Sequence, residues 1–273
     1  MPEKIPGLEF AGEVVEMGTS AMRWKPGDRV FGLTPGGAHA EFVAVPETAV
    51  TRIPENLDWI QAAAVPEVFL TAHDALRQAR FRAGERVLIH AAASGVGLAA
   101  IQLVRAFGGV PYGTSRTQEK LKRAAHLGLE ASFCTGDDLN GLATWSSEAT
   151  SGHGFDVCLD LVGGPYIPAT LGCMALKGRM MLIGTVAGGM VELPLGELFK
   201  RRLQLTATTM RSRSTVEIAE VIQRFEAEVV PLLATAKLNL SIDKIFYFNK
   251  IHDAHAFQES NQTFGKVVLD FST

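Results

Sequence analysis

The chain has 273 residues, of which 47% are hydrophobic and 20% are charged. This length and composition allow a sizeable core, spread over about two domains, and exclude fibrous and disordered proteins. With 26 basic against 29 acidic residues the net charge is -3, so no overall positive field favours nucleic acid or an anionic membrane as a partner.

Cysteine usage and apolar runs indicate the compartment. Cys134, Cys158 and Cys173 are too few and too dispersed for a disulfide framework or for a zinc site built from closely spaced pairs. The first residues lack the pattern of a signal peptide, and no stretch approaches the ~18 apolar residues of a membrane span. We expect a cytoplasmic protein in a reducing compartment.

The first part of the chain, to about Ala64, has the residue pattern typical of β-strands joined by turns. Short apolar runs over 10–16, 29–32 and 42–45 predict strands, and Lys25-Pro26-Gly27-Asp28 predicts a turn between the first two. These elements favour a small barrel or an open sheet.

From about Gln61 to Ala207, strand and helix patterns alternate, which is typical of a parallel sheet wound by helices. The strands are expected over residues 85–90, 110–114, 155–161, 179–184 and 203–207. A helix is expected to end at Phe107, and another spans 120–127 and stops at Gly128. The rest predicts a helix over 216–233, a helix over 250–260 with Asn249 as its N-cap, and a strand over 266–271.

The most informative segment follows the strand that ends at His90. It reads Ala91-Ala92-Ala93-Ser94-Gly95-Val96-Gly97 and opens a helix. A small-residue turn between a strand and a helix leaves the first helical amides open to an anion, so we expect Ala93 to Gly97 to hold a diphosphate. Only Gly97 matches the G-x-G-x-x-G pattern of dinucleotide sites, so a tight turn that binds no nucleotide is the alternative.

The end of the next strand indicates which dinucleotide would bind. An NAD site places an acidic residue about 20 positions beyond the turn, whereas an NADP site offers a cation. Here Ser115 and Arg116 are followed by Lys120, and there is no Asp or Glu from Val110 to Gln118. A 2′-phosphate would meet hydroxyls and positive charge there, which favours NADPH. The alternative is that Arg116 and Lys120 are ordinary solvent-exposed residues at the start of a helix and bind no phosphate.

Two later strands end in glycines, where ligands of open α/β sheets bind. They carry Gly163-Gly164 and Gly184-Thr185-Val186. We expect Gly164 and the second run to approach the ribose and nicotinamide of the dinucleotide. Glycines after strands are also common for steric reasons alone.

These residues together resemble the medium-chain dehydrogenase/reductase superfamily, and within it the zinc-free, zeta-crystallin-like quinone oxidoreductases. The resemblance spans nearly the whole chain. It includes the following segments: Gly7-Leu8-Glu9-Phe10-Ala11-Gly12, residues 25–30, residues 62–66, Thr71-Ala72, residues 87–97, residues 182–184 and residues 265–269. The closest branch is the p53-inducible quinone oxidoreductases, from Arg211-Ser212-Arg213 and Pro66-Glu67.

The resemblance implies a GroES-like catalytic domain from the two chain ends and a Rossmann domain between them. The expected bounds are 1–66 and 208–273 for the former and 67–207 for the latter. It also implies NADPH, a homodimer joined through the Rossmann sheet edge, and Thr71 behind the nicotinamide. Met210 and Asn261 would lie near the cleft.

One position argues against a metal. Zinc alcohol dehydrogenases carry a histidine ligand where this chain has Leu8, which cannot bind zinc. His252 and His255 lack further ligands nearby and are expected to face solvent. We therefore expect no metal site.

The chain begins just before the Gly-Leu-Glu segment, where family members have further strands and commonly a tyrosine near the nicotinamide. We expect either a fragment or truncated gene product, or a form that binds coenzyme without turnover.

The implied reaction is hydride transfer from NADPH to a quinone or an α,β-unsaturated carbonyl, and no general acid is evident in the sequence. Two alternatives stay open. One is an enoyl-thioester reductase, for which Arg211 and Arg213 would guide a phosphopantetheine carrier. The other is a catalytically silent protein that binds NADPH.

Overall fold

The structure, a computed structural model, describes residues 5–272. The chain divides into two compact units, one from its two end portions, up to Thr71 and from Thr209, and one from Ala72–Thr208. The predicted boundaries, after residues 66 and 207, lie five residues and one residue earlier. Helix α2 (Pro66–Gln78) runs through the first boundary, because its first residues pack in one unit and its last ones in the other.

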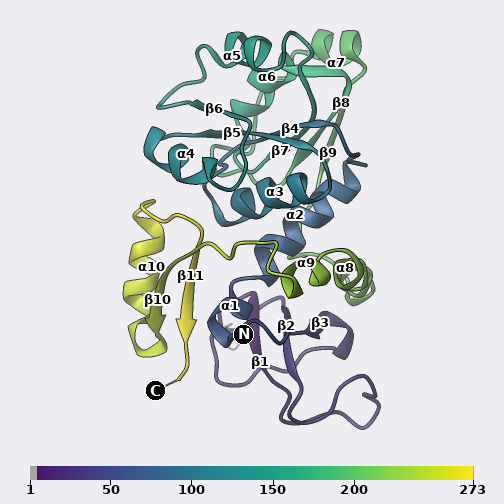
Figure 1. The fold of residues 1–273 in the computed structure, drawn as a ribbon, viewed down its shortest axis with the longest axis vertical. Coiled ribbons are helices and arrows are strands. Elements are labelled where there is room, and N and C mark those ends of the chain that lie inside the picture. Colours follow the sequence, from purple (N-terminus) through teal and green to yellow (C-terminus); the bar gives the residue numbers. More distant parts are fainter. Residues whose placement is uncertain (1–4, 273) are drawn as a thin grey trace. The chain divides into compact units, whose positions relative to one another are not determined.

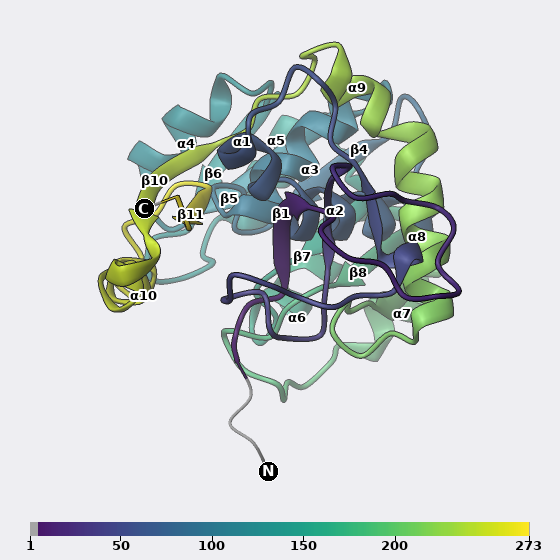
Figure 2. The ribbon, with the colours of Figure 1, turned by 90° about the horizontal axis from the view of Figure 1, so that it is seen from below.

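The first unit contains two small sheets, shown with their helices in Figures 1 and 2. The antiparallel sheet has the order β1-β2-β3, and β10 pairs in parallel with β11. Helix α10 packs beside β10 and β11. The strands are β1 (Glu9–Glu13), β2 (Arg29–Leu33), β3 (Val50–Arg52), β10 (Ile242–Tyr247) and β11 (Lys266–Asp270). The helices are η1 (Glu47–Ala49), α1 (Trp59–Ala63), α8 (Thr215–Glu228), α9 (Val230–Ala234), η2 (Phe248–Lys250) and α10 (Ile251–Glu259).

Polar contacts join the two chain ends within this unit. Glu226 of α8 accepts a hydrogen bond from the Thr51 hydroxyl at 2.5 Å and pairs with Arg23. Lys266 of β11 pairs with Glu9 of β1. Segments more than 170 residues apart in sequence therefore form one folded unit.

The second unit is a six-stranded parallel sheet with the order β6-β5-β4-β7-β8-β9. The chain order reverses between β4 and β7, as in a doubly wound Rossmann sheet, so the predicted fold class is confirmed. The strands are β4 (Arg86–Ile89), β5 (Val110–Ser115), β6 (Ala131–Cys134), β7 (Phe155–Asp160), β8 (Met174–Leu182) and β9 (Gln204–Ala207).

Helices cover both faces of this sheet (Figure 1). One face carries α3 (Gly95–Ala106) and α4 (Gln118–Ala125); the other carries α5 (Leu142–Ala149), α6 (Tyr166–Leu171) and α7 (Leu195–Arg201). Because both faces are covered, the central strands are almost continuously apolar. Leu88, Phe155 and Cys158 are fully buried in the core.

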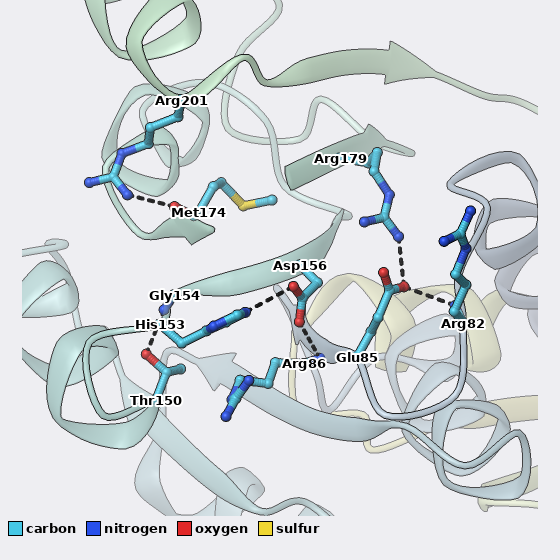
Figure 3. Close-up of polar contacts among 10 residues, drawn as sticks. All are labelled: Arg82, Glu85, Arg86, Thr150, His153, Gly154, Asp156, Met174, Arg179 and Arg201. Carbon is cyan, nitrogen blue, oxygen red and sulfur yellow. Dashed lines mark hydrogen bonds and ion pairs between the residues drawn. The ribbon is translucent and has the colours of Figure 1, made fainter. Parts of the chain in front are cut away.

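Hydrogen bonds and an ion pair of charged side chains connect neighbouring strands at the amino-terminal edge of the sheet (Figure 3). Asp156 of β7 accepts hydrogen bonds from the Arg86 amide at 2.8 Å and from the His153 ring at 3.0 Å. Glu85 pairs with Arg179 at 2.6 Å. These contacts fix β4, β7 and β8 at the edge opposite to the strand ends where a ligand is expected.

Several predicted elements are wrong in detail. Residues 42–45 form no strand, and the Phe42 side chain is 73% exposed. The helix predicted over 216–233 is two helices that meet at Val229, shortly before Pro231. The N-cap of α10 is Lys250 rather than Asn249, because a 3-10 turn precedes the helix.

Candidate functional site: the carboxyl edge of the parallel sheet

The predicted phosphate-binding turn lies between β4 and α3. Ser94 is the N-cap of α3, and its hydroxyl accepts a hydrogen bond from the Gly97 amide at 3.1 Å. Gly95 and Val96, the first residues of the helix, are partly accessible, so their amides are open to an anion. Ala93 is buried beneath them.

Gly97 is required by the close packing of this turn. A Cβ added there would lie 2.5 Å from the Ala91 carbonyl oxygen and 2.7 Å from that of Ala92. The helix can therefore begin directly against the turn only if this position is glycine. This close contact between Gly97 and the backbone of the turn keeps the amino terminus of α3 at the sheet edge.

The residues expected at the 2′-phosphate lie at the end of the neighbouring strand. β5 pairs in parallel with β4, with Ile89 opposite Gly113, so the carboxyl ends of the two strands lie side by side. Ser115 is buried, Arg116 is exposed, and Lys120 lies in the first turn of α4. A phosphate on the adenosine ribose could meet both cations there.

The glycine runs after β7 and β8 pack against each other. A Cβ on Gly163 would lie 2.9 Å from the Gly184 oxygen, and one on Gly164 would lie 2.5 Å from the Ala187 oxygen. Thr185 and Val186 are exposed beside them. Gly163 and Gly164 are buried by this packing and Gly184 is partly buried, so two strand ends distant in sequence pack together beneath the exposed Thr185 and Val186.

Asp160, at the end of β7, is a site residue that the sequence analysis missed. One oxygen of its fully buried carboxyl accepts hydrogen bonds from the amides of Val162 at 2.8 Å and Gly163 at 3.0 Å. The other oxygen is buried and has no partner among the described residues. Burial raises the pKa of Asp160, against the effect of the two amides. A buried polar atom without a partner is costly, so this oxygen suits a ligand hydroxyl or amide.

His90 fixes the strand end beneath the turn. Its two ring nitrogens lie 2.8 Å from the hydroxyls of Thr114 and Thr170, and the ring is fully buried. Burial lowers the pKa of His90 to about 3, so the ring is neutral at physiological pH. Its role is to tie β4, β5 and α6 together.

The remaining predicted residues lie in the first unit. Thr71 is buried on α2, Met210 is buried in the segment before α8, and Asn261 adopts a left-handed conformation (φ 57°) after α10. The structure therefore gathers the twelve predicted residues of the second unit at one sheet edge. The part of Thr71, Met210 and Asn261 in the same site stays a prediction.

The candidate metal ligands do not form a cluster. Within residues 5–272, no three His, Cys, Asp or Glu side chains are grouped so that they could hold a metal ion. His252 and His255 are both exposed, as predicted, and the His255 ring contacts that of His39 with centroids 5.7 Å apart.

Comparison with known proteins identifies this arrangement. Residues 1–55 match the family described as "Alcohol dehydrogenase GroES-like domain", and residues 95–227 match "Zinc-binding dehydrogenase". The "Probable quinone oxidoreductase" of Schizosaccharomyces pombe is 32% identical over 267 residues, which cover 97% of this chain and 79% of that protein.

Solved structures of oxidoreductases show the same similarity. The Escherichia coli quinone oxidoreductase complexed with NADPH has a TM-score of 0.86 and 27% identity, covering 97% of this chain and 81% of that one. The CurK enoyl reductase has a TM-score of 0.82 and 29% identity, covering 97% of this chain and 80% of that one.

The protein is therefore an oxidoreductase built from a GroES-like unit and a Rossmann unit. It belongs to the medium-chain dehydrogenase/reductase superfamily and is a quinone oxidoreductase-like member of it. Its assignment to the p53-inducible branch stays a prediction. None of the helices over residues 5–272 has the length and apolar character needed to cross a membrane.

Proposed function

We propose that the protein is an NADPH-dependent oxidoreductase that reduces quinones or α,β-unsaturated carbonyls without zinc. The observation that carries the proposal is the open turn at Ser94 to Gly97 beside Arg116, at the ends of two paired parallel strands. The unpartnered oxygen of Asp160 and the exposed Thr185 and Val186 at the same edge also fit a dinucleotide. Leu8, in place of a zinc-binding histidine, supports a reaction without metal.

The residues of the sheet edge would bind and orient the coenzyme. The amides of Gly95 and Val96 would hold its diphosphate, Arg116 and Lys120 its 2′-phosphate, and the surface around Gly164 and Gly184 its ribose and nicotinamide. When bound, NADPH supplies the hydride. Thr71 would support the nicotinamide ring, by analogy with the family.

The coenzyme preference is tested by Arg116→Asp. Replacing a cation that faces a phosphomonoester by a carboxylate should weaken NADPH at least about tenfold, since a hydrogen bond between charged groups contributes about 1.5–3 kcal/mol. NADH, which lacks the phosphate, should bind as before. The dissociation constants of both coenzymes are measured by fluorescence titration. Lys122→Asp, the same charge change at an exposed position of α4, is the control. Equal weakening of NADPH and NADH would remove Arg116 from the phosphate site.

A second candidate is an enoyl-thioester reductase, which the similarity to the CurK enoyl reductase supports. Arg211 is exposed and Arg213 is partly exposed, as an entry path for a phosphopantetheine carrier would need. Rates of NADPH oxidation with a quinone and with a crotonyl thioester distinguish the two. Faster turnover of the thioester would favour this candidate.

The third candidate is a silent NADPH-binding protein. It would bind the coenzyme in the fluorescence titration but consume none with any quinone, enone or thioester offered.

A further inference from the structure

Residues 139–142 form a tight turn between β6 and α5, in the second unit. The Leu142 amide donates a hydrogen bond to the Leu139 oxygen at 3.1 Å, and Gly141 has φ 86° and ψ -8°. These angles are those of the third residue of a type II turn, a position that favours glycine. Asn140 and Gly141 are therefore the two central residues of the turn, and both are exposed.

Two neighbouring groups of this turn are free to react with each other. The backbone amide of Gly141 makes no hydrogen bond among residues 5–272, because the hydrogen bond of the turn joins its outer residues and leaves the central peptide open. The backbone amide of Asn140 donates to the Asp138 carboxylate at 2.8 Å, but its side-chain carboxamide has no partner in the described part of the chain. A backbone nitrogen can attack the side-chain carbonyl carbon of a preceding asparagine, and a glycine at the nitrogen leaves this path unhindered.

The other asparagines of the chain lack this combination. Of five asparagines, Asn140 alone is followed by glycine. The Asn56 side chain donates to the Leu233 oxygen at 3.0 Å, so its carboxamide is engaged. Asn249 is exposed, but it lies in the 3-10 helix η2 and is followed by Lys250, whose side chain hinders the attacking nitrogen.

We propose that Asn140 is a site of spontaneous deamidation and isoaspartate formation in the folded protein. The proposal is a covalent modification of the second unit and does not depend on the coenzyme or the acceptor. Its reactants are the Asn140 side chain, the Gly141 amide and water.

The reaction balances without an oxidant, a reductant or an enzyme. The Gly141 amide loses its proton to a base in the solvent, and its nitrogen bonds to Cγ of Asn140. The bond from Cγ to Nδ2 breaks, ammonia leaves, and a succinimide ring remains. Water then opens the ring at one of its two carbonyl carbons. Opening at Cγ restores the ordinary peptide and gives aspartate, whereas opening at the backbone carbonyl gives isoaspartate, whose chain continues through Cγ.

The two products have different effects on α5. The side chains at both ends of the turn pack in the core of the second unit: Leu142 is fully buried there, and Leu139 packs against the same cluster. Isoaspartate adds one carbon to the backbone between them, so Leu139 and Leu142 cannot both keep their places. Aspartate leaves the backbone unchanged and places a negative charge just before a helix, where the helix dipole favours it. We expect isoaspartate, and not aspartate, to destabilise the unit.

The test incubates the folded protein at mildly alkaline pH in water enriched in the heavy oxygen isotope. Peptide mass spectrometry then locates each new carboxyl by its heavy oxygen, and methylation by an isoaspartyl methyltransferase measures the isoaspartate. We expect both signals at Asn140 and neither at Asn249. Asn140→Gln should lose both signals, since glutamine would have to close a larger ring, and Asn249→Gln, the matched control, should keep them.

The melting curve provides a readout of the effect on α5. The incubated protein should gain a component that melts at lower temperature, in proportion to its isoaspartate. N140Q should not gain it, and neither should Asn140→Asp before incubation, which has the new charge without the added carbon. A sample rich in isoaspartate that melts like N140Q would overturn the effect on α5.

Two results would overturn the modification itself. One is heavy oxygen at Asn140 in the urea-unfolded chain but none in the folded protein, since the turn would then protect the asparagine. The other is equal methylation of N140Q and the unaltered protein, which would place the isoaspartate elsewhere in the chain.

Discussion

His90 illustrates how a single buried side chain makes the stability of the second unit depend on pH. In the folded state its ring is neutral, with both nitrogens hydrogen-bonded to threonine hydroxyls, and its pKa is lowered to about 3 by burial. In the unfolded chain the same ring has an ordinary pKa of about 6.5. Between these two values the unfolded state binds a proton that the folded state excludes.

This difference predicts an acid-dependent loss of stability. A depressed histidine pKa means that stability is fully present above the unfolded pKa and falls as pH drops below it, by up to about 1.4 kcal/mol per pH unit. From pH 7 to pH 5 the contribution of His90 should be a loss of about 2 kcal/mol. His90→Gln, whose side chain is neutral throughout, should be less stable at pH 7 but should lack this share of the pH dependence. The free energy of unfolding of both proteins is measured by urea unfolding at the two pH values. An equal pH dependence in both proteins would show that His90 is not its source.

The turn between β4 and α3 is the element on which the coenzyme proposal depends. Since a Cβ at Gly97 would meet two backbone carbonyl oxygens within 2.7 Å, Gly97→Ala must push α3 away from the turn. Overpacking of this kind costs about 1–3 kcal/mol. We expect a lower melting temperature and weaker binding of NADPH and NADH alike, since both share the diphosphate.

Gly172→Ala is the matched control for that change. Gly172 is the C-cap of α6, has a right-handed helical conformation (φ -68°), and has open space where a Cβ would lie. Alanine should therefore be neutral there or stabilise by about 0.4–1 kcal/mol. Equal destabilisation by the two substitutions would show that the packing at Gly97 is not the cause.

In the second unit, β4, β5, β7, β8 and β9 and the helices α3 and α4 were predicted because each signal is local, whereas β6, α5, α6 and α7 were not predicted. Strands buried on both faces are short apolar runs, and the helices between them stop at glycines such as Gly128, which has a φ of 104°. β10 was missed because all six of its residues are only partly buried or exposed. Residues 42–45 were wrongly predicted as a strand because an apolar run does not reveal whether a partner strand exists.

The same difference between local sequence signals and properties of the folded environment explains which site residues were predicted. The turn at Ser94 to Gly97 was visible because the strand, turn and helix follow one another in sequence. Asp160 was missed because its unpartnered oxygen is a property of the folded environment rather than of the residue type.

At the scale of the whole molecule, the edge of the parallel sheet bears on the homodimer that the family resemblance implies. β9 is an edge strand of the sheet in the part of the chain that the structure describes, and all four of its residues are exposed. An exposed strand edge offers amides and carbonyls for pairing with another chain. We propose that a second copy of the protein pairs with β9.

The direction of the amides suggests a specific test of this dimer. The Thr208 amide donates to the Leu182 oxygen of β8 at 2.9 Å. Because successive amides of a strand alternate in direction, the Thr206 amide also points to β8, and the Ala207 amide points to the outer edge. Ala207→Pro should therefore remove an outward donor while β8 and β9 stay paired, since proline is tolerated on edge strands. We expect a shift from dimer to monomer in size-exclusion chromatography with light scattering. Ala207→Val keeps the amide and should stay dimeric; a proline variant that is as dimeric as the valine variant would exclude β9 pairing as the interface.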